Sequence, residues 1–214
     1  MKPHVTVIDY GIGNIFSICN ALDHCGAEVT LSGDIQTVSS AERLVLPGVG
    51  AFKDGMAELE ARSLIEPIKN HTLKNRPFLG ICLGMQMMLD ESEEFGTHQG
   101  LGLIPGRVIP IPDRGADGTL HKIPHIGWNN LLPPKNHKEW NSPILDTIPI
   151  GTDVYFVHSF MAVPQDDVHT LAICDYNGQH LCAVIGAGNV VGCQFHPEKS
   201  GEQGLKILTN FLRI

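Results

Sequence analysis

The first half of the sequence alternates between strand-like and helix-like patterns, and this alternation constrains the fold more than any other feature. Short runs of β-branched and aliphatic residues are separated by segments with helical periodicity and by glycines. Strands that alternate with helices predict a mostly parallel sheet with helices on both faces. The expected strands are residues 5–8, 29–31, 43–46 and 78–82, and the expected helices are residues 14–23, 52–74 and 84–89.

Three details of these expected helices are open to test. Asn14 stands where a residue caps the start of a helix. Pro67 is expected to bend or divide the long amphipathic segment 52–74. The last helix follows Gly84 directly and carries several methionines, which we expect to fill core space.

The second half contains more glycine and proline and several β-rich runs, which fit antiparallel hairpins. Asn177-Gly178 and residues 186–189 are expected to form tight turns between such runs. We find no repeat or long linker, so the 214 residues are expected to form a single domain, 1–214, in which this half completes the same sheet. The expected runs are residues 107–109, 125–132, 154–163, 170–175, 180–185 and 190–195, followed by a helix over residues 201–212. The predicted fold class is therefore α/β, with three layers, a mostly parallel central sheet and an added antiparallel β-rich part.

Charge and hydropathy exclude several classes of partner. The net charge of −8 argues against binding to nucleic acid through a basic surface. No stretch approaches the ~18 apolar residues of a membrane span, and the chain leads directly into a strand rather than a signal peptide. The six cysteines include no Cys-x-x-Cys pair and lie mostly in apolar runs, which indicates reduced thiols. We expect a cytoplasmic protein without a nucleic-acid or membrane partner.

A cysteine flanked by glycines marks the end of the strand at residues 78–82. In the sequence Gly-Ile-Cys-Leu-Gly at residues 80–84, Cys82 lies on a strand-to-helix turn. Such a turn needs small neighbours and lifts a nucleophile into a cleft, and the following helix start favours a thiolate. The backbone N–H of Leu83 would point towards the same space. Without other support, a buried core cysteine is an equally good interpretation.

The candidate base lies near the other end of the chain. His196 and Glu198 follow a strand-like run, and an extended backbone through Pro197 would place both side chains on one side. A cysteine nucleophile needs an imidazole to take its proton, and a carboxylate orients that ring. A third segment, Pro-Gly-Val-Gly at residues 47–50, also follows a strand of the parallel half, so its N–H groups would meet Cys82 at one sheet edge. Alone, it would be an ordinary turn.

Together these motifs resemble a known family. Pro-Gly-Val-Gly at residues 47–50, Gly-Ile-Cys-Leu-Gly-Met-Gln at 80–86 and Phe-His-Pro-Glu-Lys-Ser at 195–200 are similar to the class I (triad) glutamine amidotransferases. Within them, the sequence is most similar to the glutaminase subunits of imidazole glycerol phosphate synthase. This resemblance covers essentially the whole chain and includes residues 9–14, 124–129 and 155–159.

The resemblance implies a role for each matching residue. Cys82 would attack the side-chain amide of L-glutamine to give a γ-glutamyl thioester and ammonia, His196 would relay the proton and Glu198 would orient His196. Water would then release glutamate. The oxyanion hole would comprise Val49, Gly50 and Leu83, and the residues matching the glutamine pocket are Gly48, Gln86, Glu94, His158, Ser159 and Phe160. Ser159-Phe160 departs from the more common Thr-Tyr ending of this motif.

The resemblance also implies a partner. Ammonia becomes ammonium in neutral water, so a synthase must receive it. By resemblance this is a (β/α)₈ barrel cyclase that makes imidazole glycerol phosphate and aminoimidazole carboxamide ribotide in histidine biosynthesis, in a one-to-one heterodimer. Asn14, Tyr155 and Lys199 match residues near that junction. The isolated chain is expected to hydrolyse glutamine poorly until its loaded partner stimulates it, and no cofactor or metal is expected.

Two other functions remain open. The same glutaminase chemistry would serve a synthase that amidates sugars of surface polysaccharide, and the triad cannot separate the two. A non-catalytic regulatory or scaffold relative is the other alternative, against which intact Cys82, His196 and Glu198 argue. Dinucleotide binding at Gly11-x-Gly13 is discounted because the third glycine of that motif is missing. His121 and His125 lack the helical context of a zinc motif.

Overall fold

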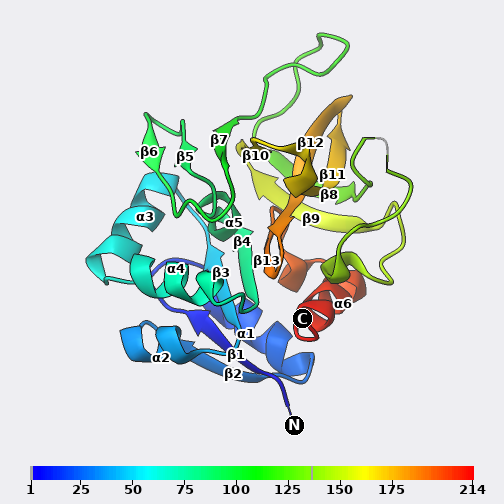
Figure 1. The fold of residues 1–214 in the computed structure, drawn as a ribbon. Coiled ribbons are helices and arrows are strands. Elements are labelled where there is room, and N and C mark those ends of the chain that lie inside the picture. Colours follow the sequence, from blue (N-terminus) through cyan, green and yellow to red (C-terminus); the bar gives the residue numbers. More distant parts are fainter. Residues whose placement is uncertain (1, 136) are drawn as a thin grey trace.

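A seven-stranded sheet runs through the centre of the computed structural model, which describes residues 2–135 and 137–214 (Figure 1). Its strand order is β11-β12-β13-β4-β3-β1-β2. The five strands from β13 to β2 are parallel, whereas β12 runs antiparallel to both of its neighbours. The bounds are β1 His4–Ile8, β2 Glu28–Ser32, β3 Leu44–Gly48, β4 Phe78–Cys82, β11 Thr170–Tyr176, β12 Gln179–Ala187 and β13 Val190–Cys193. The predicted mostly parallel sheet is confirmed.

Helices cover both faces of this sheet, because successive strand residues point to opposite sides. Val45 of β3 packs in one hydrophobic cluster with residues of α1 and α6. Its neighbours Leu44 and Leu46 pack in the other cluster, with residues of α2, α3 and α4. The helices are α1 Ile15–His24, α2 Ile35–Ser40, α3 Phe52–Ala61, α4 Ile65–Leu73, α5 Leu83–Gln86 and α6 Gly201–Phe211. The molecule therefore has the three predicted layers.

The helices differ from the prediction in three places. Segment 52–74 divides at Ser63, whose φ of 57° ends α3, whereas Pro67 lies in the first turn of α4, where no N–H is needed. The helix after Cys82 spans only residues 83–86. The prediction omitted α2, which begins where the Asp34 side chain accepts a hydrogen bond from the Thr37 N–H at 2.9 Å.

The β-rich half completes the central sheet only in part. Strands β8 (His125–Asn130) and β9 (Asp153–His158) form a separate antiparallel pair. A four-stranded sheet has the order β10-β7-β5-β6, so the predicted run 154–163 is interrupted at Ser159, where the chain passes between sheets. Its strands are β5 Glu91–Ser92, β6 His98–Gln99, β7 Gly106–Pro110 and β10 Phe160–Pro164. The 3₁₀ helices are η1 Pro143–Leu145, η2 Asp167–His169 and η3 Pro197–Lys199.

One predicted turn and the free thiols agree with the structure, whereas the predicted turn 186–189 is shorter, because β12 extends to Ala187 and leaves residues 188–189 between β12 and β13. Asn177 and Gly178 connect β11 to β12 with φ values of 53° and 78°, the geometry of a two-residue hairpin turn. All six cysteines are free thiols, four of them buried. Over the described parts of the chain, none of the helices has the length and apolar character needed to cross a membrane.

Candidate active site

Cys82 lies at the end of β4 in a strained backbone conformation. Its φ of 56° and ψ of −111° are rare for a residue with a side chain and are typical of a nucleophile on a sharp strand-to-helix turn. A Cβ at Gly84 would overlap the carbonyl oxygen of Leu46, and a Cβ at Gly80 would lie 2.6 Å from the sulfur of Met88. The close packing around this turn therefore requires both glycines.

A cavity of about 390 Å³ opens beside Cys82 and contains most of the predicted site residues. Gly48 does not line it, because it lies at the buried end of β3, where a Cβ would approach the Tyr10 hydroxyl to 2.6 Å. A larger cavity of about 540 Å³ lies over β10, β11 and β12 and contains none of the predicted residues. The active-site cavity is lined by Val49, Gly50, Cys82, Leu83, Gln86, Glu94, Phe95, Pro124, Val157, His158, Ser159, Phe160 and His196.

His196 and Glu198 form a buried pair, although not in the predicted extended conformation. Their Nδ1 and Oε1 atoms are 2.8 Å apart, and both side chains are 3% exposed. Residues 197–199 form the single 3₁₀ turn η3. The tight turn brings the carboxylate back to the ring, so the predicted contact is present but its backbone explanation was wrong.

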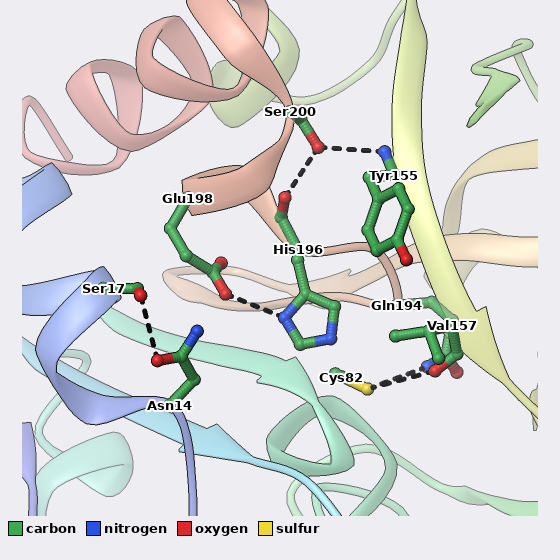
Figure 2. Close-up of polar contacts among 9 residues, drawn as sticks. All are labelled: Asn14, Ser17, Cys82, Tyr155, Val157, Gln194, His196, Glu198 and Ser200. Atoms are coloured by element: carbon green, nitrogen blue, oxygen red, sulfur yellow. Dashed lines mark hydrogen bonds and ion pairs between the residues drawn. The ribbon is translucent and has the colours of Figure 1, made fainter. Parts of the chain in front are cut away.

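The other side of the imidazole faces Cys82 (Figure 2). Nε2 is buried and has no hydrogen-bond partner among the described residues. Burial lowers the pKa of His196, but hydrogen bonding and charge interactions with the Cys82 sulfur and the Glu198 carboxylate outweigh this effect and raise the pKa to about 9. The ring therefore carries a proton at neutral pH, beside a sulfur atom that would be its acid–base partner.

The backbone of His196 is fixed to β9 on both sides. Its N–H donates to the Tyr155 carbonyl at 3.0 Å. The Ser200 hydroxyl donates to the His196 carbonyl at 2.6 Å and accepts from the Tyr155 N–H at 3.0 Å (Figure 2). Ser200 is 3% exposed, and the sequence motif gave it no role. These bonds place the imidazole relative to β9, which also forms the cavity wall at Val157.

Two buried amides connect Cys82 to the glutamine-pocket residues. The Gln86 Nε2 donates to the Phe160 carbonyl at 3.1 Å and to the Gln194 Oε1 at 3.0 Å. The Gln194 Nε2 donates to the Cys82 sulfur at 3.8 Å, and the sulfur also lies 3.9 Å from the Val157 carbonyl. The prediction included Gln86 but missed Gln194, whose only sequence signal is its place two residues before His196.

The predicted pocket residues Glu94 and His158 are both held by protein contacts. Glu94 Oε2 accepts from the Phe52 N–H at 2.6 Å, so it satisfies a donor at the start of α3. The two ring nitrogens of His158 contact the Phe160 carbonyl at 2.8 Å and His125 Nδ1 at 3.0 Å. Burial lowers the pKa values of His158 and His125 to about 3 and about 4, so both rings are neutral at pH 7.

The predicted oxyanion residues border the same cavity. Val49 and Gly50 follow β3, and Leu83 is the first residue of α5. Gly50 has a φ of 100°, which glycine adopts without strain. The buried Tyr10 hydroxyl donates to the Pro47 carbonyl at 2.8 Å and so anchors the end of the strand that leads into this loop.

The residues predicted to face a partner lie outside the cavity lining. Asn14 occupies the predicted N-cap position of α1, but its side chain accepts from the Ser17 hydroxyl at 2.9 Å and makes no bond to a helix N–H. Lys199 is exposed. Tyr155 packs edge-to-face against Trp128, with ring centroids 6.1 Å apart. Trp128, to which we assigned no role from the sequence, is 58% exposed.

Across residues 2–135 and 137–214, no group of three or more His, Cys, Asp or Glu side chains is arranged to hold a metal ion. His121 and His125 instead pack against Tyr176 with their rings tilted by 32° and their ring centroids 4.6 and 4.2 Å from it.

Comparisons with known proteins agree with this geometry. The family model "Glutamine amidotransferase class-I" matches residues 6–214. The imidazole glycerol phosphate synthase subunit HisH 1 of Legionella pneumophila (strain Lens) is 54% identical over 210 residues, 98% of this chain and 99% of the relative. The imidazole glycerol phosphate synthase subunit HisH of Aquifex aeolicus is 48% identical over 97% of this chain and 95% of its own length.

Solved structures share the fold. The chain matches "PurLQS from Thermotoga maritima" with a TM-score of 0.74 at 24% identity, covering 100% of this chain and 99% of that one. The glutaminase domain of CTPS from Trypanosoma brucei, solved with bound acivicin, matches with a TM-score of 0.63 at 14% identity, covering 100% and 94%.

Proposed function

This chain belongs to the class-I glutamine amidotransferase family, and we propose that it is the glutaminase subunit of an imidazole glycerol phosphate synthase. The observation that carries the proposal is the convergence of Cys82 with the Glu198-paired His196 beside one open cavity. Full-length relatives at 46–54% identity that bear this enzyme's name support the choice of synthase over a sugar-amidating one. The intact triad argues against a non-catalytic scaffold.

The first half of the reaction breaks the side-chain amide of glutamine. The reaction starts from the Cys82 thiolate paired with the protonated His196, and the sulfur attacks the amide carbon. Negative charge develops on the amide oxygen, where the N–H groups of Val49 and Leu83 would stabilise it. The C–N bond then breaks as the His196 Nε2–H donates its proton to the leaving nitrogen. The products are ammonia and a γ-glutamyl thioester on Cys82, with His196 neutral.

The second half returns the enzyme to its starting state. Neutral His196 takes a proton from a water molecule, whose oxygen attacks the thioester carbon. The C–S bond breaks, glutamate leaves and the sulfur departs as a thiolate beside the protonated ring. Glu198 holds the ring through Nδ1 at 2.8 Å in both halves and stabilises its positive charge.

Ammonia must reach an acceptor before water protonates it, so a second protein that receives it is part of the proposal. By family resemblance this partner is the (β/α)₈ barrel cyclase of histidine biosynthesis. The surface assigned to this partner includes Ile126 and Trp128 of β8, which are 59% and 58% exposed, and Tyr155 of the neighbouring strand β9, which pairs with Trp128. Exposed aromatic residues are enriched at the centres of protein interfaces. Asn14 and Lys199 are assigned to the same interface.

Replacement of Cys82 with alanine tests the function. With the cyclase partner present, the Cys82→Ala variant is expected to lose glutamine-dependent synthesis by at least about 10³-fold while ammonia-dependent synthesis persists. Cys19→Ala, which removes a thiol from α1, is the matched control and is expected to keep both activities. Glutamine-dependent synthesis by Cys82→Ala would show that another group is the nucleophile. If the Cys82→Ala variant also lost ammonia-dependent synthesis, a folding or assembly defect would be the cause.

A further inference from the structure

Gln194 is a fully buried side chain that touches the candidate nucleophile and has no assigned role. It lies directly after β13 and is 0% exposed. Its backbone N–H donates to the Ala183 carbonyl at 2.9 Å, so the main chain is tied to β12 and the side chain is aimed towards β4. Burying a primary amide is costly unless its donors and acceptor have partners.

The hydrogen bonds of the neighbouring amide determine which way the Gln194 amide points. The backbone carbonyl of Phe160 can only accept, so the Gln86 amide turns its nitrogen towards it, and the same nitrogen contacts the Gln194 amide at 3.0 Å. A donating nitrogen on Gln86 requires an acceptor on the Gln194 side of this contact. It follows that Gln194 presents its oxygen to Gln86 and its N–H to the Cys82 sulfur at 3.8 Å.

We propose that Gln194 is a catalytic residue of this site: its side-chain N–H donates to the Cys82 sulfur and stabilises the thiolate that attacks glutamine. The inference rests on the proposed function and adds a second donor to the sulfur, alongside His196. A donor is worth more against a charged acceptor than against a neutral one, so it favours the thiolate over the thiol. This donor is also in place in the second half of the reaction, when the C–S bond breaks and the sulfur departs as a thiolate.

The same contacts give Gln86 a defined role towards substrate. With its nitrogen occupied on the protein side, its Oε1 is the group left to face the cavity. An acceptor there suits the α-ammonium or the amide N–H of glutamine. The Gln86 amide thus contacts the Gln194 amide, and the Gln194 amide contacts the Cys82 sulfur, so these two amides connect the substrate pocket to the nucleophile.

Alkylation of Cys82 tests the proposal without relying on glutamine turnover. The rate of iodoacetamide modification is followed against pH by mass spectrometry of the Cys82 peptide, in the full-length protein. Gln194→Met keeps the shape of the side chain but removes the donor. We expect its Cys82 to react about tenfold more slowly at neutral pH, with the midpoint of the pH profile moved upwards. Gln194→Asn keeps an amide but is one methylene shorter, and we expect a change in the same direction.

Two controls separate a local effect from a general one. Cys19 serves as an internal reference, because its alkylation profile is expected to stay unchanged in every variant. Gln36→Met replaces an exposed glutamine of α2 and is expected to leave the Cys82 profile unchanged. Circular dichroism and thermal unfolding establish that each variant is folded.

The outcomes are distinct. Slower Cys82 alkylation with an upward midpoint in folded Gln194→Met or Gln194→Asn supports the proposal. An unchanged Cys82 profile in either folded variant overturns it, and so does an equal change at Cys19, which would indicate loosened packing. Failure of the parent protein to hydrolyse glutamine with its partner would count against the proposed function, whereas the alkylation profile would still report on the contact between Gln194 and sulfur.

Discussion

His196 is subject to opposing electrostatic effects, and the effects that raise its pKa outweigh the cost of burial. It is 2% exposed, and burial disfavours its charged form, yet the Cys82 sulfur and the Glu198 carboxylate raise its pKa to about 9. Between pH 6.5 and 9 the folded protein therefore binds more protons at this residue than the unfolded chain does. The resulting stabilisation is fully present below about pH 6.5 and is lost as pH rises through about 9.

This difference predicts a pH-dependent cost of replacing His196. The unfolding free energy of His196→Gln, measured by urea denaturation, is expected to fall below that of the parent by on the order of 3 kcal/mol at most at pH 6, and the gap is expected to shrink as pH approaches 10. His24→Gln, on the exposed end of α1, is the control and is expected to show no such trend. A gap that grows with pH would mean that His196 is neutral in the folded protein.

At the residue scale, the sequence was informative where a residue type has a specialised chemistry. Cys82, His196 and Glu198 were found because a thiol between glycines and an imidazole followed by a carboxylate are rare combinations. Gln194 and Ser200 were missed because amides and hydroxyls occur everywhere, and their contacts depend on chain segments far apart. Gln194 lies 112 positions from Cys82, and Ser200 lies 45 positions from Tyr155.

The β4–α5 turn is the element whose geometry the site depends on most. Gly84 packs against the carbonyl of Leu46 in β3, and a Cβ there would overlap that oxygen. We expect Gly84→Ala to lower the unfolding free energy by about 3 kcal/mol or to prevent folding, because neither backbone segment can move away. Gly26→Ala is the matched control. A Cβ at residue 26 would meet no atom within 4 Å, so only the strain of alanine at a φ of 90° is expected to lower the unfolding free energy, by about 1 kcal/mol. Equal losses of unfolding free energy in Gly84→Ala and Gly26→Ala would show that packing at the β4–α5 turn is loose.

The boundaries of elements were predicted less well than their existence. The long segment 52–74 reads as one amphipathic helix, but Ser63 adopts a left-handed conformation that no local pattern marks. The run 154–163 is continuous in β propensity, yet Ser159 separates two sheets. The pairing of His196 with Glu198 was predicted for an extended chain and occurs through a 3₁₀ turn. In each case, the propensity of the segment alone did not show where the element ends or how the chain turns.

At the scale of the whole molecule, the sheet order brings the site together. The strand β13 lies beside β4, and β4 lies beside β3, so the segments that carry His196, Cys82 and Val49 leave the sheet at neighbouring positions. The alternation of strands and helices predicted the parallel sheet, but the separate β8–β9 pair and four-stranded sheet had no distinguishing signal. The assignment of residues 1–214 to one domain stays a prediction.

The exposed face beside Tyr155 predicts how the partner would be bound. Trp128 packs on Tyr155 while remaining more than half exposed, as expected of an interface anchor. Trp128→Ala is expected to weaken cyclase binding roughly 30-fold, measured by titration calorimetry, and to reduce stimulation of glutamine hydrolysis at limiting partner. Leu73→Ala, an exposed apolar residue of α4, is the control and is expected to change neither. Unaltered binding by the Trp128 variant would place the interface elsewhere.

The central claim is that the sulfur of Cys82, assisted by His196 and Glu198, forms a covalent intermediate with glutamine. Acid quenching of the complex during glutamine turnover, followed by mass spectrometry of the Cys82 peptide, measures this directly. We expect a γ-glutamyl adduct on Cys82, absent in Cys82→Ala and much less abundant in His196→Gln. Sustained glutamine hydrolysis with no adduct on Cys82, or an adduct on another residue, would contradict the account.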